Sequence, residues 1–127
     1  MSIAALCIAW LGAAPVEVPA DGFTLAWTHS IERTRWREEW RLEGGMLRAG
    51  AAEVQGSGAG MEPPPGAVRM EDGWRWTQDL PPQERLVLAA SPHGGDHELC
   101  VGGTCRPLRG WLPPGEGPIS LSACRGG

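Results

Sequence analysis

The sequence contains no lysine, no tyrosine and only one phenylalanine in 127 residues. All eleven of its basic residues are arginines, and with fifteen acidic residues the formal net charge is −4. Nucleic-acid binding requires a clustered basic face, so this composition argues against a nucleic-acid partner. Arg35, Arg37 and Arg41 fall on one strand face, but Glu39 and Glu43 are interleaved with them, which predicts a solvated face of mixed charge.

Long apolar runs are also missing. The longest, Ile3 to Ala14, is far too short to span a bilayer. Nineteen glycines and twelve prolines separate short apolar segments, which leaves almost no window for a long helix. We therefore expect a single all-β domain over residues 1–127, an antiparallel meander that forms a small barrel or sandwich. It should contain about eight to nine short strands and at most one helical turn, at Pro107 to Leu112.

Motifs of known catalysis are absent as well. His29 and Ser30 are neighbours on a strand, so their side chains point to opposite faces and cannot act as a base and nucleophile pair. Ser57 is not followed by a helix, as a nucleophile elbow requires, and the glycine run around it lacks the lysine of a P-loop. We expect no catalytic residues, no cofactor and no metal site.

The chain does have seven tryptophans and a long alternating segment, Phe23 to Leu42. Apolar residues occupy alternate positions in both halves of this segment, which predicts a β-hairpin with one buried face. A tip at Arg33 and Thr34 brings the apolar residues opposite each other and the two ionisable residues of that face opposite each other. The predicted pairs are Ile31 with Trp36, His29 with Glu38, Trp27 with Trp40, and Leu25 with Leu42.

Two further turns can be assigned from their residues. Gly44-Gly45 predicts a two-residue hairpin turn, with Leu42 opposite Leu47, Trp40 opposite Ala49 and Glu38 opposite Ala51. Glu71-Asp72-Gly73 fits a three-residue loop that pairs Met70 with Trp74 and Val68 with Trp76. Later strands are expected at Arg85 to Ala90, His97 to Val101, Thr104 to Leu108 and Pro118 to Cys124.

The amino terminus has two interpretations. Ile3 to Ala14 is apolar enough for a signal-peptide core, but no basic region precedes it. The interpretation we favour makes Ile3 to Trp10 the first strand, followed by a turn and a strand from Val16 to Ala20, because a cleaved leader would remove Cys7.

The four cysteines suggest two disulfides. A Gly102-Gly103 turn places Cys100 and Cys105 opposite each other at a rung where Cα atoms lie about 4.5 Å apart, within reach of a bridge. Cys7 and Cys124 would then pair by elimination. Two disulfides imply an oxidising compartment, the periplasm or cell envelope. Reduced thiols in a cytoplasmic protein and a zinc site are the alternatives, and zinc is disfavoured because no Cys-x-x-Cys motif is present.

Several blocks resemble one bacterial family, the domain of unknown function DUF1850. They are Trp27 to Glu32, Trp36 to Trp40, Gly56 to Pro63, Leu99 to Val101 and Cys105 to Leu108. Members of that family are associated with genes for TRAP-type solute transporters, particularly those with TAXI solute-binding proteins, and have no assigned catalytic activity. The resemblance implies a non-enzymatic accessory role in solute uptake, with a transporter subunit or a small anionic solute as partner.

The imidazole and carboxyl groups of the hairpin are the centre of the expected site. A hydrogen-bonded pair can satisfy two buried ionisable groups, so a structural role in fixing the strand register is the simpler hypothesis. The functional hypothesis is a ligand site to which the Gly56 to Gly60 loop contributes backbone N–H groups. The predicted ligand-binding residues are His29, Ser30, Glu32, Glu38, Gly58, Gly60, Met61 and Glu62. An interaction module without a ligand and an unrecognised hydrolase are the alternative functions.

Overall fold

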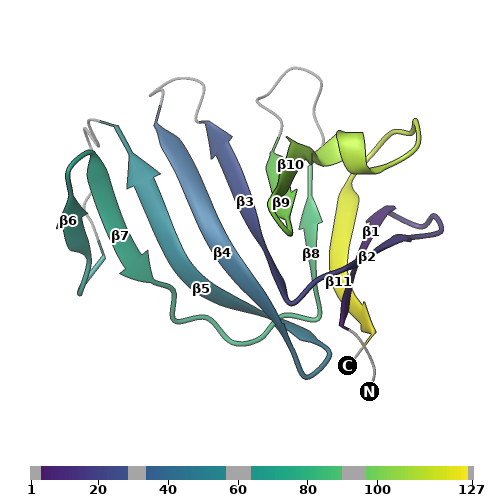
Figure 1. Ribbon diagram of the computed structural model, residues 1–127, viewed down its shortest axis with the longest axis horizontal. Coiled ribbons are helices and arrows are strands. Elements are labelled where there is room, and N and C mark those ends of the chain that lie inside the picture. Colours follow the sequence, from purple (N-terminus) through teal and green to yellow (C-terminus); the bar gives the residue numbers. More distant parts are fainter. Residues whose placement is uncertain (1–3, 29–33, 57–63, 90–96, 126–127) are drawn as a thin grey trace.

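The computed structural model describes residues 4–28, 34–56, 64–89 and 97–125, and this part of the chain is all-β, as the composition predicts. Its strands form two antiparallel sheets and do not close into a barrel (Figure 1). The four-stranded sheet has the order β2-β1-β11-β8, and the seven-stranded sheet has the order β10-β9-β3-β4-β5-β7-β6. The strands are β1 (Ala5–Trp10), β2 (Val16–Pro19), β3 (Gly22–Thr28), β4 (Arg35–Glu43), β5 (Met46–Gln55), β6 (Val68–Met70), β7 (Gly73–Thr77), β8 (Arg85–Leu88), β9 (Glu98–Val101), β10 (Thr104–Pro107) and β11 (Ile119–Arg125).

The amino-terminal apolar segment forms a strand, which confirms the interpretation we favoured. β1 lies between β2 and β11, and all six of its residues are buried. A strand covered on both faces has an almost unbroken apolar sequence, so ALCIAW resembles a leader although it is part of the fold. Cys7 of β1 and Cys124 of β11 are joined by a disulfide with a Cα–Cα distance of 5.5 Å.

The main core lies where the four-stranded sheet packs against one part of the seven-stranded sheet. Leu6 and Ile8 of β1 and Leu121 of β11 meet Leu25 and Trp40 of the larger sheet in one buried cluster. In Figure 1 the smaller sheet lies at the β9–β10 end of the larger one, whereas β7 and β6 lie at the opposite end. The larger sheet therefore extends beyond its partner.

The β3–β4 hairpin has a different register from the one predicted. Trp27 pairs with Trp36, Phe23 with Trp40, and Leu25 with Glu38, so His29 is not the cross-strand partner of Glu38. The prediction of a tip at Arg33 and Thr34 is wrong. The observed register stacks aromatic rings, with centroids 6.2 Å apart for Phe23 and Trp40 and 6.3 Å apart for Trp27 and Trp36.

The β4–β5 hairpin agrees with its prediction near the turn. Gly44 and Gly45 have positive φ angles of 61° and 79°, and Leu42 pairs with Leu47 and Trp40 with Ala49. Further along, the register shifts between Glu38 and Trp40, so that Glu38 faces Ala52 and not Ala51. This β-bulge keeps Ala49, Ala52 and Val54 on the buried face, although the spacing between the first two is odd.

The β6–β7 connection is a two-residue turn at Glu71-Asp72, not the predicted three-residue loop. Met70 pairs with Gly73 and Arg69 with Trp74, which replaces the predicted pairs of Met70 with Trp74 and Val68 with Trp76. Gly73 is a strand residue that also pairs with Gln55 of β5. A Cβ atom there would lie 1.8 Å from the backbone oxygen of Val54, so the close approach of two strands explains this glycine.

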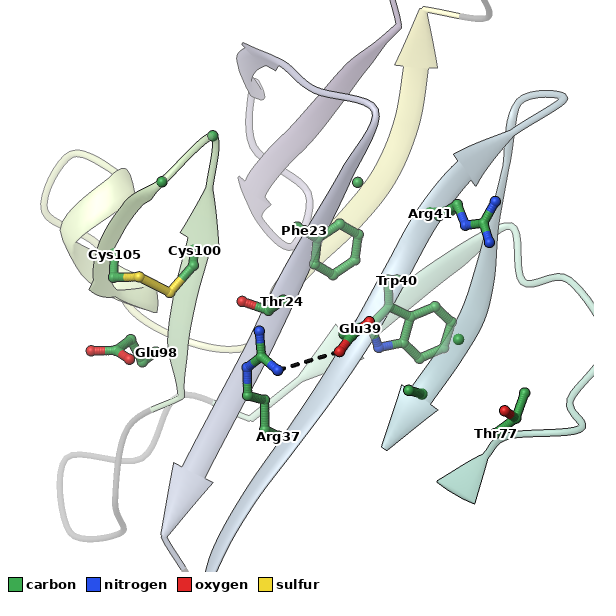
Figure 2. Close-up of a pocket in the computed structure, with 15 residues that line it drawn as sticks. Phe23, Thr24, Arg37, Glu39, Trp40, Arg41, Thr77, Glu98, Cys100 and Cys105 are labelled. Carbon is green, nitrogen blue, oxygen red and sulfur yellow. Dashed lines mark hydrogen bonds and ion pairs between the residues drawn. A yellow bond between two sulfur atoms is a disulfide. The ribbon is translucent and has the colours of Figure 1, made fainter. Parts of the chain in front are cut away.

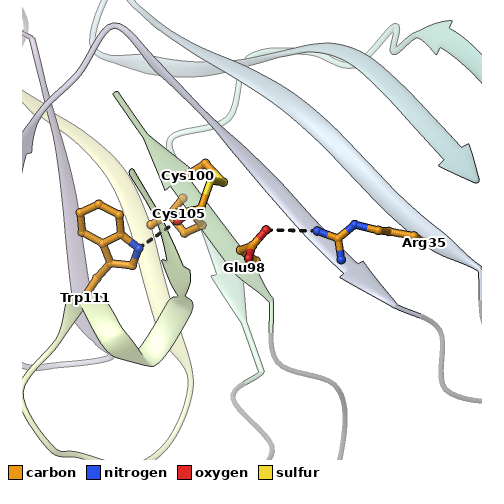
Figure 3. Close-up of a disulfide and its surroundings, with 6 residues drawn as sticks. Arg35, Glu98, Cys100, Cys105 and Trp111 are labelled. Carbon is orange, nitrogen blue, oxygen red and sulfur yellow. Dashed lines mark hydrogen bonds and ion pairs between the residues drawn. A yellow bond between two sulfur atoms is a disulfide. The ribbon is translucent and has the colours of Figure 1, made fainter. Parts of the chain in front are cut away.

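The β9–β10 hairpin and the following turn agree with the sequence. Cys100 pairs with Cys105 and forms a disulfide with it across the strands. The short 3-10 helix η1 (Leu108–Trp111) follows β10, and the Trp111 Nε1–H donates to the Leu99 carbonyl oxygen over 3.0 Å (Figure 3). Trp111 thus anchors η1 to β9. No helix in the described ranges has the length and apolarity needed to cross a membrane.

Candidate functional site

Four tryptophans gather on the side of the seven-stranded sheet that faces the core, beyond the buried cluster. Trp27 and Trp36 share a rung with Val54 and Trp74, and Trp76 lies on the next rung, where Leu25, Glu38 and Ala52 are paired. Paired residues of antiparallel strands point to the same face, so all of these side chains lie on one surface. We call this surface, formed by Trp27, Trp36, Trp74, Trp76 and Glu38, the inner tryptophan face.

The rings of the inner tryptophan face contact one another. Trp27 stacks on Trp36 with an angle of 6° between the ring planes, and Trp36 meets Trp76 edge to face at 87° with centroids 6.1 Å apart. His97 lies against Trp27, with centroids 5.1 Å apart. All four tryptophans are only half-buried. Trp27 touches the core cluster, whereas Trp36, Trp74 and Trp76 lie outside the part of it formed by the described residues.

Glu38 is the ionisable residue at the centre of this surface. Its position on β4 lies between Trp36 and Trp40, and the Trp40 Nε1–H donates to its carboxyl oxygen over 3.4 Å. Burial raises the pKa of Glu38 above its usual value, and the hydrogen bond from Trp40 and the nearby Gln78 amide oppose this shift without cancelling it. The Gln78 amide nitrogen is buried and has no hydrogen bond of normal geometry within the described structure. The carboxyl group is therefore held in an apolar and incompletely satisfied environment.

Cations on the same side of the larger sheet lie at its edges. Arg69 of β6 stacks over Trp74, with its guanidinium carbon 5.8 Å from the ring centroid. Arg106 of β10 stacks over Trp111 in the same way, at 4.8 Å. Within the described ranges, neither these arginines nor any other cation forms an ion pair with Glu38.

The predicted ligand-binding residues are only partly within the described structure. Glu38 is described and lies on the inner tryptophan face. The others, His29, Ser30, Glu32, Gly58, Gly60, Met61 and Glu62, lie outside the described residues. The strands β3 and β5 end, and the strands β4 and β9 begin, at the same end of the sheet, next to the Trp27–Trp36 rung (Figure 1). Thr28 and Gln55, the last residues of β3 and β5, therefore lie at this end of the sheet.

Sequence reasoning did not identify the tryptophans themselves as site residues. Their alternation predicted core positions, because an apolar residue on the inner face of a strand is normally covered by the opposite sheet. Whether a second sheet covers a given rung depends on how many strands each sheet contains, and a local pattern does not carry that information. The only sequence signal was the unusual content of seven tryptophans beside one phenylalanine.

The opposite side of the sheet carries a broad open groove of about 930 Å³ (Figure 2). The side chains of Arg37, Glu39, Arg41 and Glu98 line it together with the Cys100–Cys105 disulfide. Most of the charges on this side are already paired within the protein. Arg37 lies 3.3 Å from Glu39, Arg75 bridges Glu39 and Glu53, and Arg35 lies 3.1 Å from Glu98 (Figure 3).

These pairs confirm the mixed-charge strand face predicted from the sequence. The hydrogen bond to Glu53 raises the pKa of the Arg75 guanidinium, so the arginine stays charged. Exposed pairs of this kind contribute little stability each. A surface whose charges satisfy one another is a weaker candidate for ligand recognition than the inner tryptophan face.

Among the described residues, two groups of side chains have the proximity of metal ligands, Cys7 with Glu17 and Cys124, and Glu98 with Cys100 and Cys105. In both groups the two cysteines form a disulfide, and zinc requires thiolates as its sulfur ligands. Neither group fits a metal centre in this oxidised chain.

Comparison with known proteins gave one result. No curated protein and no solved structure matched the chain. The model of one protein family matched residues 23–108, a range that includes the hairpin, the inner tryptophan face and the β9–β10 disulfide. The chain belongs to this family, DUF1850, which is described as a domain of unknown function.

Proposed function

We propose that this protein is a non-enzymatic accessory component of a TRAP-type uptake system of the TAXI kind and binds a small solute on its inner tryptophan face. The transporter link comes from the gene associations of the family that the sequence resembles. Two disulfides support an oxidising compartment, and we place the protein in the periplasm or cell envelope.

One observation carries the binding site, the gathering of half-buried tryptophans around a carboxyl group outside the core. Large aromatic side chains contribute to stability when they are buried, so an apolar cluster that is left partly exposed is a candidate contact surface. Trp36 and Trp76 contact each other in the described structure and yet remain accessible. Glu38 adds a polar group whose pKa is raised because burial disfavours its charged form.

The anionic solute expected from the sequence fits the described part of this face poorly. An anion needs a cation or several N–H donors, whereas Glu38 brings a negative charge to the centre of the surface. The described cations on this side lie at the sheet edges, so recognition of an anion would need further donors near the centre of the face.

Calorimetric titration of the purified full-length protein with a panel of anionic, neutral and cationic solutes tests this proposal. Binding of any member should be weakened by Trp36→Leu and changed by Glu38→Gln, and it should be unaffected by Glu39→Gln. Glu39 is the matched control, because it is the next residue on β4 and its side chain lies on the opposite face with Arg37 and Arg75.

Two results would replace the proposal with one of its alternatives. Absence of binding by every solute, together with co-purification of a TRAP subunit, would identify an interaction module without a ligand. Turnover of a generic ester or phosphate substrate that depends on His29 would identify a hydrolase.

A further inference from the structure

We propose that the solute bound by the inner tryptophan face is a small organic cation, with the Glu38 carboxylate as its counter-charge and Trp36 and Trp76 as its aromatic contacts. This inference rests on the proposed function, because it takes the same face as the solute site and adds the charge class of the solute.

The distribution of charge on the face is the first argument. The strands β3, β4, β5 and β7 are described in full, and Glu38 is the one ionisable residue that they place on the inner side. Within the described ranges it forms no ion pair. A half-buried carboxylate without a counter-ion is destabilised, and a bound cation would remove that cost. Away from Arg69, which stacks over Trp74 at the sheet edge, the face is thus electrostatically complementary to a positive charge.

The tryptophan rings supply the second requirement. A cation is attracted to the face of an indole ring within about 6 Å of its centroid, and tryptophan is the strongest of the aromatic side chains in this role. Trp36 and Trp76 meet at 87°, so their ring planes form a corner. Glu38 follows Trp36 by two residues on the same face of β4, and it shares a rung with Trp76 across Ala52. Aromatic rings that meet at an angle form the cages that recognise methylated ammonium groups, and Glu38 lies on the same face as these two rings.

The protein already forms cation–π contacts on this side of the sheet. Arg69 lies over Trp74 at 5.8 Å, and Trp74 belongs to the same face as Trp36. Trp74 therefore has a cation of the chain itself, whereas Trp36 and Trp76 contact other rings and no cation within the described structure. This difference assigns the solute to the Trp36–Trp76 corner.

A saccharide is the other solute that stacks on tryptophan, and the polar groups of the face argue against it. Its hydroxyl groups would each need a hydrogen-bond partner when they are desolvated. Near the centre of the face, the described strands offer the carboxyl group of Glu38, and Gln78 follows β7 with an amide. One carboxylate and one amide satisfy a single cationic group better than a ring of hydroxyls.

Three probes of matched shape separate charge from size. Choline carries a trimethylammonium group, 3,3-dimethylbutanol is its neutral carbon analogue, and 3,3-dimethylbutanoate replaces the positive charge with a negative one at the other end. We expect isothermal titration of the full chain to show choline binding about tenfold more tightly than dimethylbutanol, and no binding of dimethylbutanoate. Glu38→Gln should reduce choline affinity by about the same factor, and Glu39→Gln should leave it unchanged.

Equal or tighter binding of dimethylbutanol, dimethylbutanoate or maltose would overturn the inference but leave the solute-binding proposal standing. Choline binding that survives Glu38→Gln would also overturn it. Trp76→Phe provides a second variant that keeps an aromatic ring, and it should reduce the affinity for choline by a smaller factor than Trp76→Leu does. Circular dichroism of each variant establishes that it is folded.

Discussion

At the scale of single residues, Glu38 connects the fold to the proposed function. Its carboxyl group accepts a hydrogen bond from Trp40, and burial raises its pKa above the usual value. A raised folded-state pKa means that the folded protein binds the proton more tightly than the unfolded chain. The ionised carboxylate therefore lowers the free energy of unfolding at neutral pH. A residue that destabilises its own fold in this way is a candidate for binding.

Replacing Glu38 with glutamine should stabilise the isolated protein at neutral pH. Glutamine keeps a carbonyl oxygen that accepts the Trp40 N–H and removes the charge that burial penalises. The stabilisation should be largest above the raised pKa and should disappear at pH values below about 4, where both states of the native residue are protonated. Thermal unfolding at pH 7 and at acidic pH measures this difference.

Glu39→Gln serves as the control in that experiment. It removes exposed ion pairs to Arg37 and Arg75, so a change of about 1 kcal/mol or less is expected. A lower melting temperature of the Glu38 variant at pH 7 would show that the carboxylate stabilises the fold.

At the scale of strands and turns, alternation predicted faces better than it predicted register. A slip of one residue turns a strand over, whereas a slip of an even number leaves every side chain on the same face. The β3–β4 register differs from the prediction by such an even step, so Trp27, Trp36 and Glu38 lie on the predicted face although their partners differ. The predicted His29–Glu38 pair depended on the exact register of β3 and β4, and it was wrong because the predicted register was wrong.

The bulge in β5 and the β6–β7 turn were beyond sequence reasoning for related causes. On β4 one residue lies between Glu38 and Trp40, whereas on β5 two residues, Gly50 and Ala51, lie between their partners. The position of such a bulge depends on which alanine side chain fits the core, and the AGAA segment of β5 contains three alanines that could do so. Gly73 was assigned to the left-handed position of a turn, but it is a strand residue with a φ of 149° whose place is fixed by contact with a second strand. The two glycine pairs at Gly44 and Gly102 were predicted correctly, since both residues of each turn have positive φ.

Gly73→Ala tests the interpretation of that glycine. A Cβ atom would lie 1.8 Å from the Val54 carbonyl oxygen, so β5 and β7 would have to separate. We expect a loss of about 3 kcal/mol in the free energy of unfolding, measured by urea denaturation. Gly110→Ala is the control, because its Cβ would contact the Arg106 side chain at an ordinary 3.5 Å. Equal stability of the two variants would contradict the account of the β5–β7 contact.

At the scale of the whole molecule, the two sheets differ in width, and this difference creates the candidate site. Four strands cover the part of the seven-stranded sheet that contains Phe23, Leu25 and Trp40. The rungs that contain Trp36, Trp74 and Trp76 extend past the buried cluster. Composition predicted the all-β class and left open the choice between barrel and sandwich, because that choice depends on sheet widths and on long-range pairings such as β1 with β11.

The two disulfides should contribute unequally to stability. Cys7–Cys124 closes a loop of sequence separation 117 and joins the first strand to the last, whereas Cys100–Cys105 has a separation of 5. The chain-entropy relation gives about 5 kcal/mol for the long loop and about 2 kcal/mol for the short one. Urea denaturation of the paired serine variants should therefore show a larger loss for Cys7→Ser with Cys124→Ser. A larger loss for the hairpin pair would contradict this ranking.

The central claim is that the inner tryptophan face binds a small organic cation, and the indole N–H signals of the ¹⁵N-labelled protein report on it directly. On addition of choline, the signals of Trp36 and Trp76 should shift with a common saturation curve. The Trp10 indole, buried and bonded to the Pro113 carbonyl oxygen, should not move. Unchanged Trp36 and Trp76 signals, or shifts confined to arginine side chains lining the groove on the opposite side of the sheet, would contradict the claim.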